Sequence, residues 1–166
     1  MVGLTQVKFL LIDDNVHMLN IVETILRGFG ARRIVRAATS EAALDQIRGG
    51  IDIIITDYMI GGLDVIAFTK GIRQKPGVHD RFVPIILLTS HSSRSRIEAA
   101  RDAGVTEICT KPVTPRELFR RIVAVVDYPR PFVQSPNYVG PCRRRRVDAA
   151  YDGPERRAGA MATTAA

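Results

Sequence analysis

The amino-acid sequence predicts an α/β protein with a doubly wound parallel sheet, and two observations support this. Four apolar runs of strand length, VKFLLI, IDIIIT, VPIILL and VTEICT, are spaced along the chain. Continuous apolar runs are typical of parallel strands that are buried on both faces. Segments with helical periodicity lie between the runs, joined by short connections. This alternation favours a parallel sheet with helices on both faces, because strand–helix–strand crossovers are right-handed.

The first part of the chain supplies three strands and two helices. Residues 7–12 and 51–56 form strong strands, whereas residues 33–37 contain two arginines and form a weaker strand, expected at a sheet edge. Residues 17–29 form the first helix, because five apolar side chains share one face at helical spacing: Leu19, Val22, Ile25, Leu26 and Phe29.

The remaining helices are bounded by capping residues. Thr39 or Ser40 begins the second helix, which ends at residue 48 before two glycines. Residues 64–73 and 93–103 form the third and fourth helices. Thr114 begins the fifth, with proline at its favoured first position, and its apolar stripe consists of Leu118, Ile122, Val125 and Val126.

Polar side chains of complementary kinds follow the four strong strands. Asp13 and Asp14 follow the first, Asp57 the next, Thr89 the fourth and Lys111 the fifth. Ligands of open parallel sheets bind outside the carboxyl ends of the strands, so we expect these side chains to converge. Each residue alone is ordinary, as a helix cap, a turn residue, a satisfied hydroxyl or a solvated charge. Their joint placement is what indicates a site.

The residue types indicate phosphoryl chemistry. Neighbouring carboxylates repel one another, and a hard cation such as Mg²⁺, which prefers oxygen ligands, relieves that repulsion. Asp57 can then attack a phosphoryl donor as a nucleophile. Mg²⁺ and the Lys111 ammonium stabilise the phosphoryl oxygens, and the Thr89 hydroxyl donates a hydrogen bond to the product.

Other function classes lack their sequence patterns. No glycine-rich phosphate loop follows the first strand, and HExxH, CxxC and GxSxG patterns are absent from the sequence. Two cysteines make no disulfide framework. No signal peptide or membrane-length apolar run is present, so we expect a cytoplasmic protein that does not bind membranes.

The composition changes after residue 127. We expect residues 1–127 to form one folded domain and residues 128–166 to form a mostly disordered tail. The tail holds five of the nine prolines, and seven arginines against three acidic residues. A Y-x-G-P-x-R-R pattern begins at Tyr138 and again at Tyr151. We interpret this repeat as a partner-binding motif; drift within a low-complexity tail is the alternative.

The segments LLIDDN, IIITDYM, IILLTS and CTKP resemble, in order and spacing, the receiver domain of bacterial two-component response regulators. That family includes the chemotaxis response regulator, and the resemblance covers roughly residues 5–127. It implies a flavodoxin-like fold, a five-stranded sheet in the order 2-1-3-4-5 flanked by five helices. No output domain is expected to follow, so the chain resembles a stand-alone receiver with a basic tail.

The resemblance also implies roles for individual residues. Asp57 would be the phosphoacceptor, Thr89 the switch hydroxyl and Lys111 the phosphate partner, with a cis peptide bond between Lys111 and Pro112. Direct Mg²⁺ ligands would be Asp14, Asp57 and the backbone carbonyl of Met59, whereas Asp13 would act mainly through water. The side chains that flank the phosphoryl group, and so set its lifetime, would be Met59 and His91.

The chain departs from the family pattern at two places. Where the family usually has Met-Pro after the acceptor and a glycine a few residues later, this chain has Ile60-Gly61 and Val65. The switch position three residues before the lysine, usually aromatic, is Ile108. The usual coupling of the threonine to an aromatic ring is therefore not expected here.

We therefore expect a response regulator that accepts a phosphoryl group from a histidine kinase or phosphotransfer protein and then binds an unidentified downstream protein. It would not be an enzyme beyond Mg²⁺-dependent self-phosphorylation and slow self-dephosphorylation. The alternative is a nucleic-acid-associated protein whose tail contacts phosphates through Arg143 to Arg146 and bases through Tyr138 and Tyr151. A third reading is a degenerate receiver used as a scaffold, against which the intact acidic residues and Lys111 argue.

Overall fold

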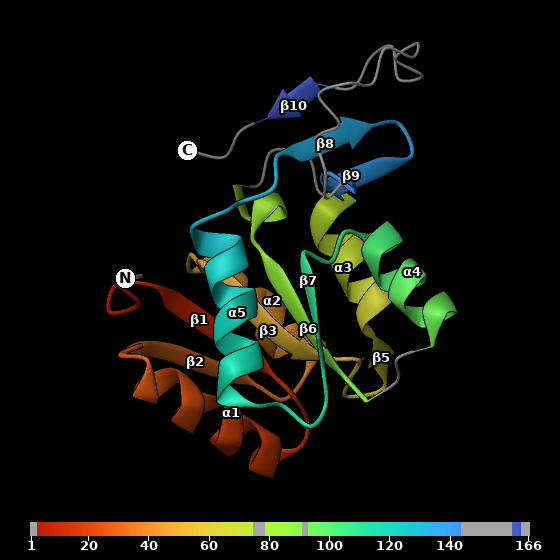
Figure 1. Cartoon of the computed structure of the whole chain (residues 1–166). Coiled ribbons are helices and arrows are strands. Elements are labelled where there is room, and N and C mark those ends of the chain that lie inside the picture. Colours follow the sequence, from red (N-terminus) through yellow and green to blue (C-terminus); the bar gives the residue numbers. More distant parts are fainter. Residues whose placement is uncertain (1–2, 75–78, 91–92, 144–160, 164–166) are drawn as a thin grey trace.

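A computed structural model describes residues 3–74, 79–90, 93–143 and 161–163. Its centre is a five-stranded parallel sheet in the order β2-β1-β3-β6-β7 (Figure 1). The strands are β1 (Lys8–Ile12), β2 (Arg33–Ala37), β3 (Ile53–Asp57), β6 (Ile85–Thr89) and β7 (Glu107–Thr110). In chain order these are the five principal strands, so the predicted order 2-1-3-4-5 is confirmed. The weak strand β2 lies at the edge, as expected.

Five helices cover the two faces of the sheet (Figure 1). One face packs against α1 (Val16–Gly28) and α5 (Pro115–Val126), and the other against α2 (Ser40–Arg48), α3 (Val65–Gln74) and α4 (Arg94–Ala103). Alternate strand residues supply the two cores. In β1, Phe9 and Leu11 face α1 and α5, whereas Leu10 and Ile12 face the other three helices. This explains why the strands are apolar throughout.

The helix ends follow the capping chemistry in the sequence. The Thr39 hydroxyl accepts the Ala42 amide at the start of α2, and Thr114 accepts the Glu117 amide at the start of α5. One detail of the predicted α5 stripe is wrong, because Val126 is 36% exposed. Within the described parts of the chain, no helix is both long and apolar enough to cross a membrane.

A small hairpin that the sequence did not reveal follows β3. Its strands, β4 (Met59–Ile60) and β5 (Leu63–Asp64), are joined by Gly61 and Gly62. Both glycines have positive φ, 53° and 88°. A two-residue hairpin turn of this kind requires positive φ at both central positions, which glycine adopts without steric cost.

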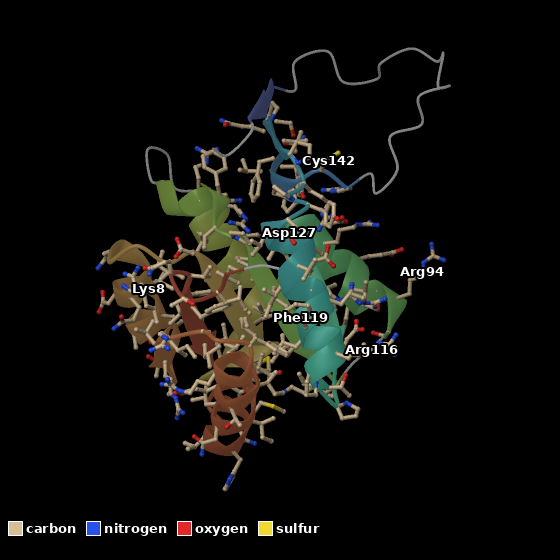
Figure 2. All side chains as sticks on the ribbon, turned by 60° about the vertical axis from the view of Figure 1, so that its left-hand side comes forward. Lys8, Arg94, Arg116, Phe119, Asp127 and Cys142 are labelled. Atoms are coloured by element: carbon tan, nitrogen blue, oxygen red, sulfur yellow. The ribbon has the colours of Figure 1, made fainter. Side chains whose placement is uncertain are left out.

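The expectation of a mostly disordered tail is wrong for the residues that follow α5. A second, antiparallel sheet forms there, in the order β10-β8-β9. It consists of β8 (Phe132–Ser135), β9 (Tyr138–Pro141) and β10 (Met161–Thr163). The β8–β9 hairpin lies beyond the C-terminal ends of α4 and α5 (Figures 1 and 2). Residues 144–160 and 164–166, which include Arg144, Arg145, Arg146 and Tyr151, lie outside the described residues.

The β8–β9 hairpin is ordered because it packs over apolar side chains and over the buried guanidinium of Arg73. Phe132 is 6% exposed and packs edge-on against Phe82, with ring centroids 5.4 Å apart. Its ring lies 5.1 Å from the Arg73 guanidinium, which is itself fully buried. Burial lowers the pKa of Arg73 to about 9, so this side chain is still charged at neutral pH.

Backbone carbonyls compensate the buried charge of Arg73. Its Nε and Nη2 donate to the Gly104 carbonyl at 3.2 and 3.0 Å, and its Nη1 donates to the Arg81 carbonyl. Gly104 is the C-cap of α4. Because the C-terminal end of a helix carries partial negative charge, a guanidinium is stabilised there. Arg73 thus joins α3, α4 and the hairpin.

The first copy of the repeated motif serves this packing. The Tyr138 hydroxyl donates to the Pro141 carbonyl at 2.7 Å, and the Arg143 guanidinium lies 4.1 Å from the Tyr138 ring. A Cβ atom on Gly140 would lie 2.9 Å from the Gly104 Cα, so only glycine fits. The tyrosine, glycine, proline and first arginine of the motif therefore all have intramolecular roles in this copy.

We predict that Phe132→Ala lowers the free energy of unfolding by about 3 kcal/mol, the usual cost of truncating a buried phenylalanine. A chain that ends at Asp127 should lose at least as much. Urea unfolding monitored by circular dichroism measures the change. Tyr128→Ala is the matched control, because this nearby aromatic side chain is 74% exposed, and it should change stability by less than about 0.5 kcal/mol. Equal midpoints for Phe132→Ala and Tyr128→Ala would contradict the prediction.

Candidate phosphoacceptor and cation site

Three of the predicted site residues come together at the carboxyl ends of the parallel strands. Asp13 follows β1, Asp57 ends β3, and Lys111 follows β7. The Lys111 Nζ lies 2.8 Å from Asp57 Oδ1 and 3.7 Å from Asp13 Oδ2. The backbone holds this arrangement, since the Lys111 amide donates to the carbonyl of Thr89 at the end of β6, at 2.8 Å. The Lys111–Pro112 peptide bond is cis, as expected.

Asp13 is a buried carboxylate with one oxygen, Oδ2, that accepts no hydrogen bond from the described residues. Its Oδ1 accepts the Asn15 amide at 2.8 Å, and Asn15 in turn caps α1 by accepting the amides of His17 and Met18. Its Oδ2 is buried and accepts no hydrogen bond from the described residues. Burial raises the pKa of Asp13, as do the charges of Asp57 and Asp14, against the opposing effects of the Asn15 amide and Lys111.

These features fit a divalent cation. Asp13 Oδ2, which accepts no hydrogen bond, and the adjacent Asp57 carboxylate are hard oxygen donors of the kind Mg²⁺ prefers, and an added positive charge would offset their repulsion. The side chains alone do not form a finished metal cage, however. Across the described ranges, no group of three or more histidine, cysteine, aspartate or glutamate side chains is arranged to hold a metal ion. Asp14 is exposed, and Lys111 supplies the counter-charge instead.

The other predicted residues differ in what the structure says of them. Thr89 is 2% exposed at the end of β6, on the same edge as Asp57. Met59 begins β4, two residues after Asp57, and is 45% exposed. The metal-binding role of its carbonyl stays a prediction. His91 lies outside the described residues.

Sequence reasoning missed a contact made by Tyr58, the residue that follows Asp57. The Arg96 guanidinium, from the first turn of α4, lies 5.2 Å from the centre of the Tyr58 ring. Both residue types are ordinary on a surface, and the two lie far apart in the chain. No local pattern could have revealed their pairing.

Comparisons with known proteins agree with this geometry. The family model of the response regulator receiver domain matches residues 9–123. The chemotaxis protein CheY-3 of Vibrio cholerae is 29% identical over 121 residues, which cover 72% of this chain and 92% of that protein. The structure of the chemotaxis response regulator CheY4 of Vibrio cholerae has a TM-score of 0.65 at 26% identity, covering 72% of this chain and 98% of that one.

A further solved structure bears on the metal. It is the receiver domain of the sensor histidine kinase PA1611 of Pseudomonas aeruginosa, with a magnesium ion coordinated in its active site cleft. It has a TM-score of 0.62 at 30% identity and covers 70% of this chain and 93% of that one.

The matched model spans most of the chain, and this protein belongs to the response regulator receiver domain family. Receiver domains are signalling modules of two-component phosphorelays rather than enzymes with a separate substrate. They accept phosphoryl groups, interact with histidine kinases and phosphotransfer proteins, and typically use Mg²⁺.

We predict that Lys111→Met raises the affinity for Mg²⁺ by about three- to tenfold, because removing the ammonium leaves the carboxylates without their internal counter-charge. Isothermal titration calorimetry measures this affinity. Lys8→Met is the matched control, since Lys8 begins β1 at the opposite end of the sheet, where its Nζ donates to the Gly49 carbonyl. An unchanged or lower affinity of Lys111→Met would show that Lys111 does not compete with the cation.

Proposed function

We propose that this chain is a response regulator that accepts a phosphoryl group on Asp57 from a histidine kinase or a phosphotransfer protein. The observation that carries the proposal is the 2.8 Å contact between Lys111 Nζ and Asp57 Oδ1, beside the buried Asp13 carboxylate. Asp57 is 23% exposed, so an incoming donor can reach it, whereas Asp13 at 4% is enclosed. The accessible carboxylate of the pair is therefore the acceptor.

The transfer forms a mixed anhydride. A carboxylate oxygen of Asp57 attacks the phosphorus of the donor phosphohistidine, the phosphorus–nitrogen bond breaks, and the imidazole leaves with its electron pair and takes up a proton. Lys111 then pairs with a phosphoryl oxygen instead of the carboxylate, and the Thr89 hydroxyl donates a hydrogen bond to another. These charge-assisted contacts are stronger after transfer than before, because the phosphoryl group carries more negative charge.

Bound Mg²⁺ would neutralise the charge of the carboxylates and of the phosphoryl oxygens. Asp13, Asp14, Asp57 and the Met59 carbonyl would hold it, with Asp14 as a direct ligand and Asp13 acting mainly through water. The acyl phosphate is lost when water attacks phosphorus, which releases inorganic phosphate and restores the Asp57 carboxylate.

The phosphorylated state would signal by binding a downstream protein through the surface formed by α4, β7 and α5. The competing idea of nucleic-acid binding through the tail has less support. Arg143 lies on the Tyr138 ring and 3.3 Å from the Asp102 carboxylate. Arg143 and Tyr138 thus make contacts within the protein. Arg144, Arg145 and Arg146 lie outside the described residues.

We predict that Asp57→Asn abolishes phosphorylation by phosphoramidate in the presence of Mg²⁺, because an amide cannot act as the nucleophile. Intact-protein mass spectrometry reports the added phosphoryl group. Asp45→Asn, which alters a carboxylate 70% exposed on α2, serves as the control and should be phosphorylated normally. Phosphoryl labelling that survives Asp57→Asn would sink the assignment of the acceptor.

We predict that Met59→Asn shortens the lifetime of the acyl phosphate severalfold. An apolar side chain beside the phosphoryl group hinders an attacking water, whereas an amide can hydrogen-bond to that water and orient it. The decay of the phosphorylated protein is timed by mass spectrometry after the donor is removed. Ile21→Asn is the matched control, since Ile21 is exposed to a similar degree but lies on α1. If both variants decay at the rate of the unmodified protein, Met59 does not reach the site.

A further inference from the structure

A cluster of side chains around one small space connects the carboxyl end of the sheet to α4. Its residues come from β6, α4, β7 and the connection between β3 and β4: Tyr58, Leu87, Thr89, Arg96, Ile97 and Ile108. The space between them is too small to hold a water molecule. Because these side chains line one small space, a shift of one of them changes the room that the others can occupy.

The cluster contains one aromatic ring, and it does not come from β7. Ile108 occupies the β7 position and is branched at Cβ, which restricts its rotamers. The ring is that of Tyr58, whose backbone is fixed by donation from the Val65 amide to its carbonyl at 2.9 Å. Tyr58 adjoins Asp57 in sequence, and its ring faces Arg96 on α4.

Arg96 is held differently from its neighbour Arg94. The Nε of Arg94 pairs with Glu98 at 2.8 Å. Among the described residues, Arg96 has no carboxylate partner within salt-bridge distance. Its guanidinium lies over the Tyr58 ring. A cation–π contact at an exposed site is weaker than a charge-assisted hydrogen bond to an anion. New negative charge beside Tyr58 would therefore compete with the ring for Arg96.

We propose that Tyr58 and Arg96 couple phosphorylation to α4, in place of an aromatic side chain at position 108. This inference rests on the proposed function of Asp57. Phosphorylation draws the Thr89 side chain toward the phosphoryl group and places negative charge next to Tyr58. Both changes weaken the hold of the ring on Arg96 and loosen the first turn of α4. Tyr58 and Arg96 act through Thr89 and α4 and are positioning residues, not catalytic ones.

The test is hydrogen exchange of the α4 backbone amides in the full chain, measured by mass spectrometry with and without phosphoramidate and Mg²⁺. In the unmodified protein, the donor should speed exchange in the first turn of α4. Without the donor, Arg96→Gln and Tyr58→Leu should already exchange about two- to fivefold faster there, the factor that corresponds to the loss of one exposed cation–π contact. Adding the donor should then change their exchange little.

Two conservative controls separate coupling from general loosening. Tyr58→Phe keeps the ring and should keep the response to the donor. Arg94→Gln removes a neighbouring charge of the same helix that projects into solvent (Figure 2), and it should also respond normally. Arg96 is itself exposed, so Arg96→Gln preserves the fold and decides the question if Tyr58→Leu unfolds.

Phosphoryl uptake is read from the intact mass of the same samples, which keeps the two proposals distinguishable. If the unmodified protein takes up no phosphoryl group, the proposed function fails and this inference fails with it. If uptake is normal and α4 responds to the donor equally in Arg96→Gln and in the unmodified protein, the coupling role is overturned while the function of Asp57 stands.

Discussion

The repulsion between the Asp13 and Asp57 carboxylates is the constraint on which the site depends. Parallel strands β1 and β3 deliver both side chains to the same edge, and Asp13 lies where water cannot fully screen its charge. The Lys111 ammonium offsets this repulsion from the far side of β6. The hydrogen bond from the Lys111 amide to the Thr89 carbonyl fixes the backbone position from which this ammonium contacts the carboxylates.

The two hydrophobic layers fix the geometry of that edge. Each central strand packs on both faces, so a shift of one residue in register would exchange its two sets of side chains between the layers. The α1 side needs Phe9 and Leu11 and the α4 side needs Leu10 and Ile12, which holds Asp13 at the strand end. The hydrophobic core thus positions the Asp13 carboxylate as well as stabilising the fold.

The strands and the strand-end residues were predictable because their causes are local. Burial on both faces makes β1, β3 and β6 continuously apolar. Asp57 ends the apolar run of β3, and Lys111 directly follows β7. The tail was not predictable, because Phe132 orders only by meeting Phe82 and Arg73, which lie 50 and 59 residues away in the chain. Arg73 itself would be read from sequence as a solvated helix charge. Similarly, nothing local links Tyr58 to Arg96.

The attachment of α4 at its C-terminal end has a mechanical consequence. There Gly104 is bound by Arg73, which the β8–β9 hairpin covers, and Gly140 approaches its backbone closely. A helix that is fixed at its C-terminal end and released at its N-terminal end would tilt instead of sliding along its axis. With a length of about 15 Å for ten residues, α4 tilted by about 5° would move its first turn by roughly 1 Å. The β8–β9 hairpin would therefore be the pivot of such a tilt, although it lies at the opposite end of the sheet from Asp57.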